Sequence, residues 1–305
     1  MKLIGSYQNG NYTVSIFDDG TKIRENDLDF FEPNTVESMD IKITNKCDRS
    51  CPMCHEDSQK DGKHGDIWSP CFLDKLHPYT ELAIGGGNPL EHPDLLPFLI
   101  KCKEHKFIPS MTVNQVHFMQ NIDYLKELCR SELIYGLGIS LVNPSDEFIN
   151  AVKEFPNAVI HIINGLVTDS DIDKLKNNNL KILILGYKMV RRGISNYNVH
   201  SSRIDDNMFY LKNELKNLVD THSFKCISFD NLALTQLDVK NTLNMSDSEW
   251  EMFYMGDDGR SEMTSCSMFI DMVERKFARN SCDMHRYPLM ETVEEMYNFL
   301  KEVKE

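Results

Sequence analysis

The feature that most constrains the fold is a repeated alternation of short apolar runs with amphipathic segments, which begins near Ser38. Strand-like runs cover residues 39–44, 82–84, 108–113, 136–141, 158–163 and 182–185, and residues 226–229 form a candidate seventh run. Strands that alternate with helices at this interval imply βαβ units and a parallel sheet. Right-handed crossovers would curl six such units into a barrel or part of one. The class is therefore α/β, and the pattern leaves open both a closed eight-unit barrel and an open six-unit one.

The segment before this repeat, residues 1–36, has the pattern of a small β-meander. Asn9-Gly10 separates two β-rich runs, and Asp19-Gly20 precedes a third. Asn-Gly and Asp-Gly between alternating residues are strong signals of short hairpins. We predict an N-terminal meander that is accessory to a main domain over residues 37–230.

The segment after the repeat, residues 231–305, is expected to be a C-terminal extension over one mouth or edge of the sheet. Residues 267–273 and 276–281 indicate a short β-hairpin. Residues 292–303 indicate a terminal helix, because apolar residues recur there at helical spacing.

Composition restricts the partners and the compartment. The 305 residues carry a formal net charge of −14, which disfavours a nucleic-acid-binding surface. No apolar run approaches the roughly 18 residues that would cross a bilayer, and the N-terminus has no apolar signal region. We therefore expect a cytoplasmic protein without a membrane partner. Its nine cysteines then favour metal-binding or catalytic thiols over a disulfide framework.

Three of these cysteines, Cys47, Cys51 and Cys54, follow the first strand of the repeat at the spacing C-x3-C-x2-C. This spacing brings three thiols to one tight loop, where all three can reach a single metal centre. Thiolates at this density suit iron–sulfur clusters, zinc or copper(I). In a [4Fe–4S] cluster, three protein thiols would leave one iron open to bind a ligand.

Other short motifs follow the later strands. These are GGGNPL at 85–90, TVNQ at 112–115, ISLVNP at 139–144 and HIING at 161–165. In parallel α/β folds, ligands bind at the carboxyl ends of the strands. The convergence of five motifs on one edge of the sheet predicts the site there.

The cysteine spacing and these motifs resemble the radical S-adenosylmethionine (radical SAM) superfamily over about residues 38–190. The resemblance implies an open, partial (β/α)6 TIM-like barrel. It also implies a [4Fe–4S] cluster held by Cys47, Cys51 and Cys54. The cluster would cleave S-adenosylmethionine reductively, and the resulting 5′-deoxyadenosyl radical would take a hydrogen atom from a substrate. A reductase or flavodoxin-like protein would supply the electron.

The same resemblance assigns residues to S-adenosylmethionine. They are Met53, Gly86, Gly87, Asn88, Pro89, Asn114, Ser140, Gly165 and Lys188. Two of them depart from the family pattern. Met53 stands where an aromatic residue is usual, and Asn88 replaces a glutamate, so that a charge is absent.

Two other interpretations of the cysteines stay open. Cys51 to His55 matches the C-x-x-C-H attachment site of c-type haem, which would require export. A zinc site made of the three cysteines and His55 would instead staple an interaction module. The iron content of anaerobically purified protein would separate these alternatives from a radical SAM enzyme.

The sequence leaves the substrate, the reaction after hydrogen abstraction and the oligomeric state undefined. A peptide or protein substrate is favoured, because a strand edge of the meander can receive an extended peptide by β-augmentation. A small molecule or nucleotide is the alternative. Cys266 and Cys282 flank the predicted hairpin, so both thiols could face one mouth of the barrel and donate a hydrogen atom to a substrate radical. The favoured alternative is that both are buried apolar residues or solvent-facing residues without a role in the reaction.

Overall fold

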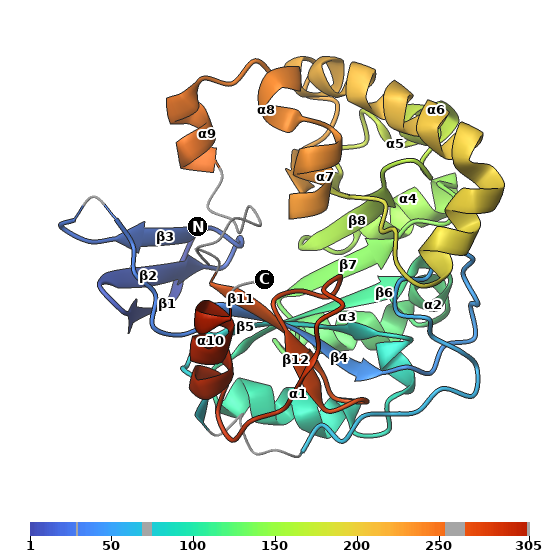
Figure 1. Ribbon diagram of the computed structural model, residues 1–305. Helices are drawn as coiled ribbons and strands as arrows, with labels where there is room; N and C mark the ends of the chain where they lie inside the picture. The colour runs from blue at the N-terminus through green and yellow to red at the C-terminus, as the bar shows by residue number, and fades with distance from the viewer. Residues whose placement is uncertain (29, 69–74, 254–265, 304–305) are drawn as a thin grey trace.

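A computed structural model describes residues 1–28, 30–68, 75–253 and 266–303. Its main sheet has ten strands in the order β10-β9-β8-β7-β6-β5-β4-β11-β12-β13 (Figure 1). Seven of them are parallel and follow one another in sequence: β4 (Ser38–Thr44), β5 (Glu81–Gly86), β6 (Ile108–Asn114), β7 (Gly136–Ser140), β8 (Ala158–Ile163), β9 (Lys181–Leu185) and β10 (Cys226–Phe229). The predicted α/β class with a parallel sheet is confirmed.

Helices lie between successive parallel strands from β5 to β10, and others follow β10 in the sequence. They are η2 (Pro89–Glu91), α1 (Leu95–Glu104), α2 (Gln115–Gln120), α3 (Ile122–Arg130), α4 (Asp146–Lys153), α5 (Asp169–Leu175), α6 (Arg192–Asp220), α7 (Asn231–Gln236), α8 (Val239–Thr242) and α9 (Asp247–Phe253). Side-chain caps define several starts: the Ser145 hydroxyl accepts from the Phe148 amide at 3.2 Å, and Thr168 forms a capping box with Asp171. None of the helices in the described ranges has the length and apolar composition that crossing a membrane requires.

The two faces of the parallel sheet differ in composition. The outer face is aliphatic and joins the helices in one hydrophobic core, with Ile41, Ile84 and Ile139 among its fully buried residues. On β4 to β7 the inner face carries small or polar residues instead: Asp40, Lys42, Ala83, Gly85, Ser110, Thr112, Gly136, Gly138 and Ser140. On β8 and β9 it carries His161 together with the aliphatic residues Val159, Leu183 and Leu185. A closed TIM barrel fills its interior with bulky side chains. Here the small side chains leave a cavity of about 1840 Å³.

The C-terminal extension differs from its expected position. The predicted hairpin exists as β11 (Ser267–Asp271) and β12 (Lys276–Ala278), followed by β13 (Tyr287–Pro288) and α10 (Val293–Glu302). However, β11 pairs in parallel with β4 and so continues the main sheet instead of only covering it. The pairing gives partners to backbone groups that the edge of β4 would otherwise expose. With β10 and β11 added, the parallel part of the sheet is wider than the six-unit form that we expected.

The predicted N-terminal meander is present as a separate sheet, β1 (Leu3–Asn9), β2 (Tyr12–Phe17) and β3 (Lys22–Glu25), beside the main sheet in Figure 1. A buried carboxylate, Glu37, joins the two sheets. It accepts a hydrogen bond from the Tyr12 hydroxyl at 2.6 Å and forms ion pairs with Arg24 at 2.6 Å and Lys22 at 3.2 Å. Burial alone would raise the pKa of Glu37, but Arg24 and Lys22 hold it at about 2.

Candidate cofactor and substrate site

The three clustered cysteines lie on the loop that follows β4, at the mouth of the cavity. All three are free thiols, half-buried, and they line the cavity together with Met53. Backbone hydrogen bonds close the loop on itself: the amide of Asn45 donates to Lys63 at 2.8 Å, and that of Cys47 to Gln59 at 2.8 Å. The loop therefore leaves the sheet and returns to it as a closed backbone turn that carries all three cysteines.

The chemistry of these thiols fits a metal centre. Burial, and then the neighbouring thiols, raise the pKa of both Cys47 and Cys51. Three thiolates could therefore share this loop only if a cationic centre balanced their charge. On the outer side of the loop, the buried His117 contacts Asp48 at 2.6 Å, with the Cys47 sulfur close by. The donor set suits an iron–sulfur cluster, and three thiols alone would leave part of such a cluster open to the cavity.

The glycine-rich loop after β5 lies against the base of the cysteine loop. The Gly87 amide donates to the Thr44 carbonyl at 2.8 Å. Gly86 has a φ of +112°, and a Cβ there would lie 2.3 Å from the same carbonyl; a Cβ on Gly87 would lie 2.2 Å from the Lys46 carbonyl. Both glycines also line the cavity. Because they lack a Cβ, the backbone here can pack against the cysteine loop and still be reached closely by a ligand.

The other predicted cofactor residues divide into two groups. Asn114 and Ser140 are neighbours in register across β6 and β7, and both line the cavity, as does Lys188. Asn88, Pro89 and Gly165 are not among the residues that line it. Asn88 is buried and its side chain caps the following turn, accepting from the Leu90 amide at 3.3 Å.

Gly165 lies instead against helix α6. It has a φ of +85°, and a Cβ there would lie 2.7 Å from the side chain of Ile204. Its carbonyl accepts a hydrogen bond from Asn207 at 3.0 Å. Close packing against the helix and a left-handed backbone explain this glycine without a ligand.

The structure does not bring the two candidate hydrogen-atom donors to the same place. Cys282 lines the cavity, next to Ser281, which accepts a hydrogen bond from Lys188 at 3.1 Å. Cys266 is not among the lining residues, and its sulfur lies 3.3 Å from the Tyr12 hydroxyl at the junction with the N-terminal meander. The start of the hairpin, before β11, therefore lies at the junction with the meander, whereas the segment after β12 reaches the cavity.

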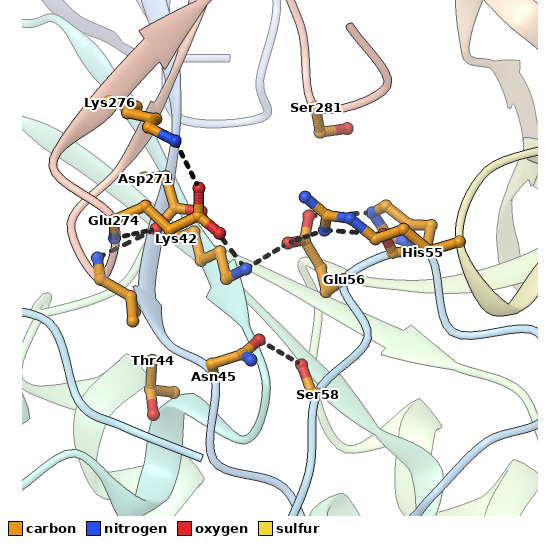
Figure 2. Close-up of polar contacts among 12 residues, drawn as sticks. Lys42, Thr44, Asn45, His55, Glu56, Ser58, Asp271, Glu274, Lys276 and Ser281 are labelled. Atoms are coloured by element: carbon orange, nitrogen blue, oxygen red, sulfur yellow. Dashed lines mark hydrogen bonds and ion pairs between the residues drawn. The ribbon is translucent and has the colours of Figure 1, made fainter. Parts of the chain in front are cut away.

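Sequence reasoning missed a buried ion network behind the cysteine loop, drawn in Figure 2. Lys42, with 3% of its side chain exposed, pairs with Glu56 at 2.8 Å and with Asp271 at 3.3 Å. Glu56 also contacts His55 at 3.2 Å and Arg191 at 3.5 Å. Burial alone would raise the pKa of Glu56, but His55 and Lys42 outweigh it and hold that pKa well below its ordinary value. The network ties the cysteine loop to β4, β11 and the segment after β9.

Comparison with known proteins was made for sequence and for structure. No family model matches the chain. A 7,8-dihydro-6-hydroxymethylpterin dimethyltransferase from Methanocaldococcus jannaschii is 30% identical over 106 residues. That alignment covers 31% of this chain and 20% of the dimethyltransferase, so it relates the chain to only a fifth of that protein's length.

SuiB from Streptococcus suis is similar in structure. The crystal structure of SuiB bound to S-adenosylmethionine matches with a TM-score of 0.58 and 12% identity, over 93% of this chain and 84% of SuiB. The crystal structure of SuiB bound to the precursor peptide SuiA matches with a TM-score of 0.54 and 15% identity, over 84% of this chain and 63% of SuiB. At these identities, the likeness shows a shared fold.

The site and the fold therefore define an α/β protein whose large cavity opens beside a loop of three free thiols. The resemblance to the radical SAM superfamily, predicted from the C-x3-C-x2-C loop, is confirmed.

Proposed function

We propose that this protein is a radical SAM enzyme in which Cys47, Cys51 and Cys54 hold a [4Fe–4S] cluster beside bound S-adenosylmethionine. The observation that carries the proposal is the placement of three half-buried, free thiols at the mouth of one large cavity. When bound, the cluster and S-adenosylmethionine would supply a 5′-deoxyadenosyl radical for hydrogen abstraction. The partial barrel would orient both cofactors and exclude water.

The chain's own residues suggest how S-adenosylmethionine would be held. The backbone of Gly86 and Gly87 can approach a ligand closely, and Asn114 and Ser140 add two adjacent polar side chains at the strand ends. Lys188 lines the same cavity and suits a carboxylate. Met53, beside the third cysteine, would contact the adenine through an apolar side chain.

The test is anaerobic purification followed by reduction in the presence of S-adenosylmethionine. We expect iron and sulfide in a ratio near that of a single cluster, and 5′-deoxyadenosine as a product. Zinc without iron, and no cleavage of S-adenosylmethionine, would instead support the zinc-stapled interaction module. The engagement of His55 with Glu56 argues against that site, because His55 would be its fourth ligand.

A peptide or protein is the first candidate substrate. SuiB, which shares this fold, has been solved with a precursor peptide. In the small sheet, β1 and β3 are the end strands and offer edges to an extended chain. Purification of the protein together with the product of a neighbouring gene, followed by mass spectrometry, would test this candidate through a mass change that depends on the cysteine loop.

A small molecule is the second candidate substrate, and the hollow interior of the sheet favours it. The cavity extends along the small residues of the inner face as well as past the cysteine loop. The partial relative from Methanocaldococcus jannaschii is named for a pterin substrate. A nucleotide or pterin that is modified in a cofactor-dependent way would support this candidate.

Cys282 remains a candidate hydrogen-atom donor, because it lines the cavity and a thiol S–H bond is weak. Cys266 serves as the matched control, because it lies against Tyr12 away from the lining residues. With substrate in hand, Cys282→Ala should still form 5′-deoxyadenosine but accumulate a trapped radical or an aberrant product. Normal turnover of Cys282→Ala would exclude this role.

A further inference from the structure

The strand that leads into the cysteine loop carries a second charged side chain, Asp40, which faces the cavity two positions before Lys42. Asp40 is exposed to the cavity. Across the described ranges, no hydrogen bond or ion pair reaches its carboxylate. Burial within the barrel, opposed by Lys188, raises the pKa of Asp40 above its ordinary value. The carboxylate thus faces the cavity as an acceptor without a protein partner in these ranges, and a donor group from a ligand would stabilise its ionised form.

The charged groups that face Asp40 do not supply this donor themselves. Lys188 is near enough to influence its pKa, but the Lys188 ammonium donates to the Ser281 hydroxyl at 3.1 Å. The other two influences, Glu56 and Asp230, are acidic. Glu56 is already paired with Lys42, and Asp230 caps helix α7 by accepting from the Ala233 amide at 2.7 Å.

The row of residues that runs from Asp40 across the next three strands is made of small side chains. Asp40 is in register with Ala83 on β5, Ala83 with Ser110 on β6, and Ser110 with Gly136 on β7, and all of them line the cavity. On the other side, the in-register neighbour of Asp40 is Phe269 of β11. Further along β7, Gly138 leaves room for His161, because a Cβ there would lie 2.4 Å from the His161 ring.

His161 itself has no hydrogen-bond partner for its ring among the residues that the structure describes. Burial, and then Lys188, lower the pKa of His161 to about 4. The ring is therefore neutral near pH 7 and offers one donor and one acceptor. The cavity thus presents an acceptor-only group, a neutral ring and a row of small side chains that leaves room for a planar ligand.

We infer that Asp40 binds a planar fork of N–H donors on the substrate, which lies along the row of small residues formed by Ala83, Ser110 and Gly136. A carboxylate accepts two parallel N–H bonds from such a fork, and this geometry gives both affinity and orientation. The inference rests on the proposed function, because it assigns the part of the substrate that enters the barrel. Two sources carry this chemistry: the 2-amino-4-oxopyrimidine edge of a pterin or guanine, and the guanidinium group of an arginine side chain in a peptide.

The experiment is calorimetric titration of the full-length, anaerobically purified protein with two pairs of probes. Pterin has the fork, whereas lumazine replaces its 2-amino group with an oxygen. Agmatine has the fork, whereas n-butylamine has a single ammonium group. We expect one member of a pair, pterin or agmatine, to bind at least tenfold more tightly than its matched analogue. Tighter binding of pterin would identify a heterocyclic substrate, and tighter binding of agmatine an arginine-bearing peptide.

Two variants test which residues are responsible. Asp40→Asn keeps the shape of the side chain but replaces one hydrogen-bond acceptor with an NH2 donor, which cannot pair with an N–H of the fork. It should therefore weaken binding of the preferred probe about ten- to a hundredfold. Gly136→Ala should weaken it as well, because the new methyl group would project from the row of small residues into the cavity beside the ligand. Thermal unfolding would confirm that both variants fold, and the comparison of probes on the unmodified protein does not depend on either.

The inference is overturned if neither fork-bearing probe binds, if each binds no more tightly than its analogue, or if Asp40→Asn binds the preferred probe unchanged. These results are separate from failure of the proposed function. A wild-type protein that cleaves S-adenosylmethionine but shows no preference for the fork would refute only the role of Asp40.

Discussion

Two charged residues on the same strand, Lys42 and Asp40, have opposite surroundings. Lys42 is 3% exposed and its charge is balanced by Glu56 and Asp271 within the fold. Asp40 faces the cavity, and no partner for it exists among the described residues. Buried charges are tolerated when they are paired. Near the cysteine loop, the chain therefore balances its buried charges itself, whereas on the same face of β4 it presents the carboxylate of Asp40 to the cavity.

The largest expected effect comes from the loop that the ion network supports. Cys54→Ala should lose bound iron and form no 5′-deoxyadenosine, because two thiols are too few to hold a cluster with one open iron. Iron analysis and product chromatography measure both losses. Cys226→Ala, which removes an exposed thiol on β10, is the control and should retain both. Retained cleavage in Cys54→Ala would contradict the assignment of the site.

The next largest effect is expected when Lys42, the residue whose charge is balanced within the fold, is removed. Lys42→Ala leaves Glu56 and Asp271 buried without their shared partner, so we expect the free energy of unfolding to fall by about 3–5 kcal/mol. Urea unfolding measures this loss. Lys276→Ala removes an exposed pair with Glu274 at 3.3 Å and should cost about 1 kcal/mol or less. Equal losses in the two variants would show that the buried network has no special structural role.

At the junction of the two sheets, Glu37 is also buried and paired. Its contribution to the free energy of unfolding should depend on pH. Its pKa of about 2 in the folded state lies below the value of about 4.3 that is usual for an unfolded chain. The unfolded state therefore binds the proton first. Glu37 should contribute about 3 kcal/mol above pH ~5, and this contribution should disappear as the pH falls from ~4 towards ~2.

Urea unfolding at several pH values would test this dependence. The stability of Glu37→Gln should be lower than that of the wild type at pH 7, and the difference should shrink as the pH falls. Glu32→Gln, at an exposed position, is the control and should follow the wild type at each pH. A constant difference between Glu37→Gln and the wild type would refute the linkage.

A smaller effect is expected at Ser140, which lines the cavity and is proposed to contact S-adenosylmethionine. Ser140→Ala should weaken S-adenosylmethionine binding by roughly ten- to a hundredfold, because a hydrogen bond to a charged group contributes about 1.5–3 kcal/mol. Iron content and unfolding free energy should stay near their wild-type values, in contrast to Lys42→Ala. An unchanged dissociation constant would show that Ser140 does not contact S-adenosylmethionine.

Local pattern predicted most of the individual strands. The run at 108–113 became β6 (Ile108–Asn114), and the run at 158–163 became β8 (Ala158–Ile163), because alternation and flanking turns are encoded within each segment. The pairing of β11 with β4 was not predictable in this way. It joins segments that are far apart in the sequence, and neither segment carries a local signal that names its partner.

In the candidate site as well, local features could be predicted from the sequence, whereas contacts between distant segments could not. The spacing of Cys47, Cys51 and Cys54 places three thiols on one loop whatever the rest of the chain does. Asp40 and Lys42 did have a signal, since they are charges at alternate positions of an otherwise aliphatic strand. That signal could assign both residues to one face of the strand. It could not show which of them is balanced, because Glu56 and Asp271 come from other elements.

The position of β11 beside β4 also sets an order of assembly during synthesis. Lys42 and the cysteine loop leave the ribosome before Asp271, which helps to balance Lys42 and lies much later in the sequence. Until then, β4 has an open edge and the network behind the loop lacks one of its carboxylates. The cysteine loop therefore reaches its full support only after β11 has been made and has paired with β4.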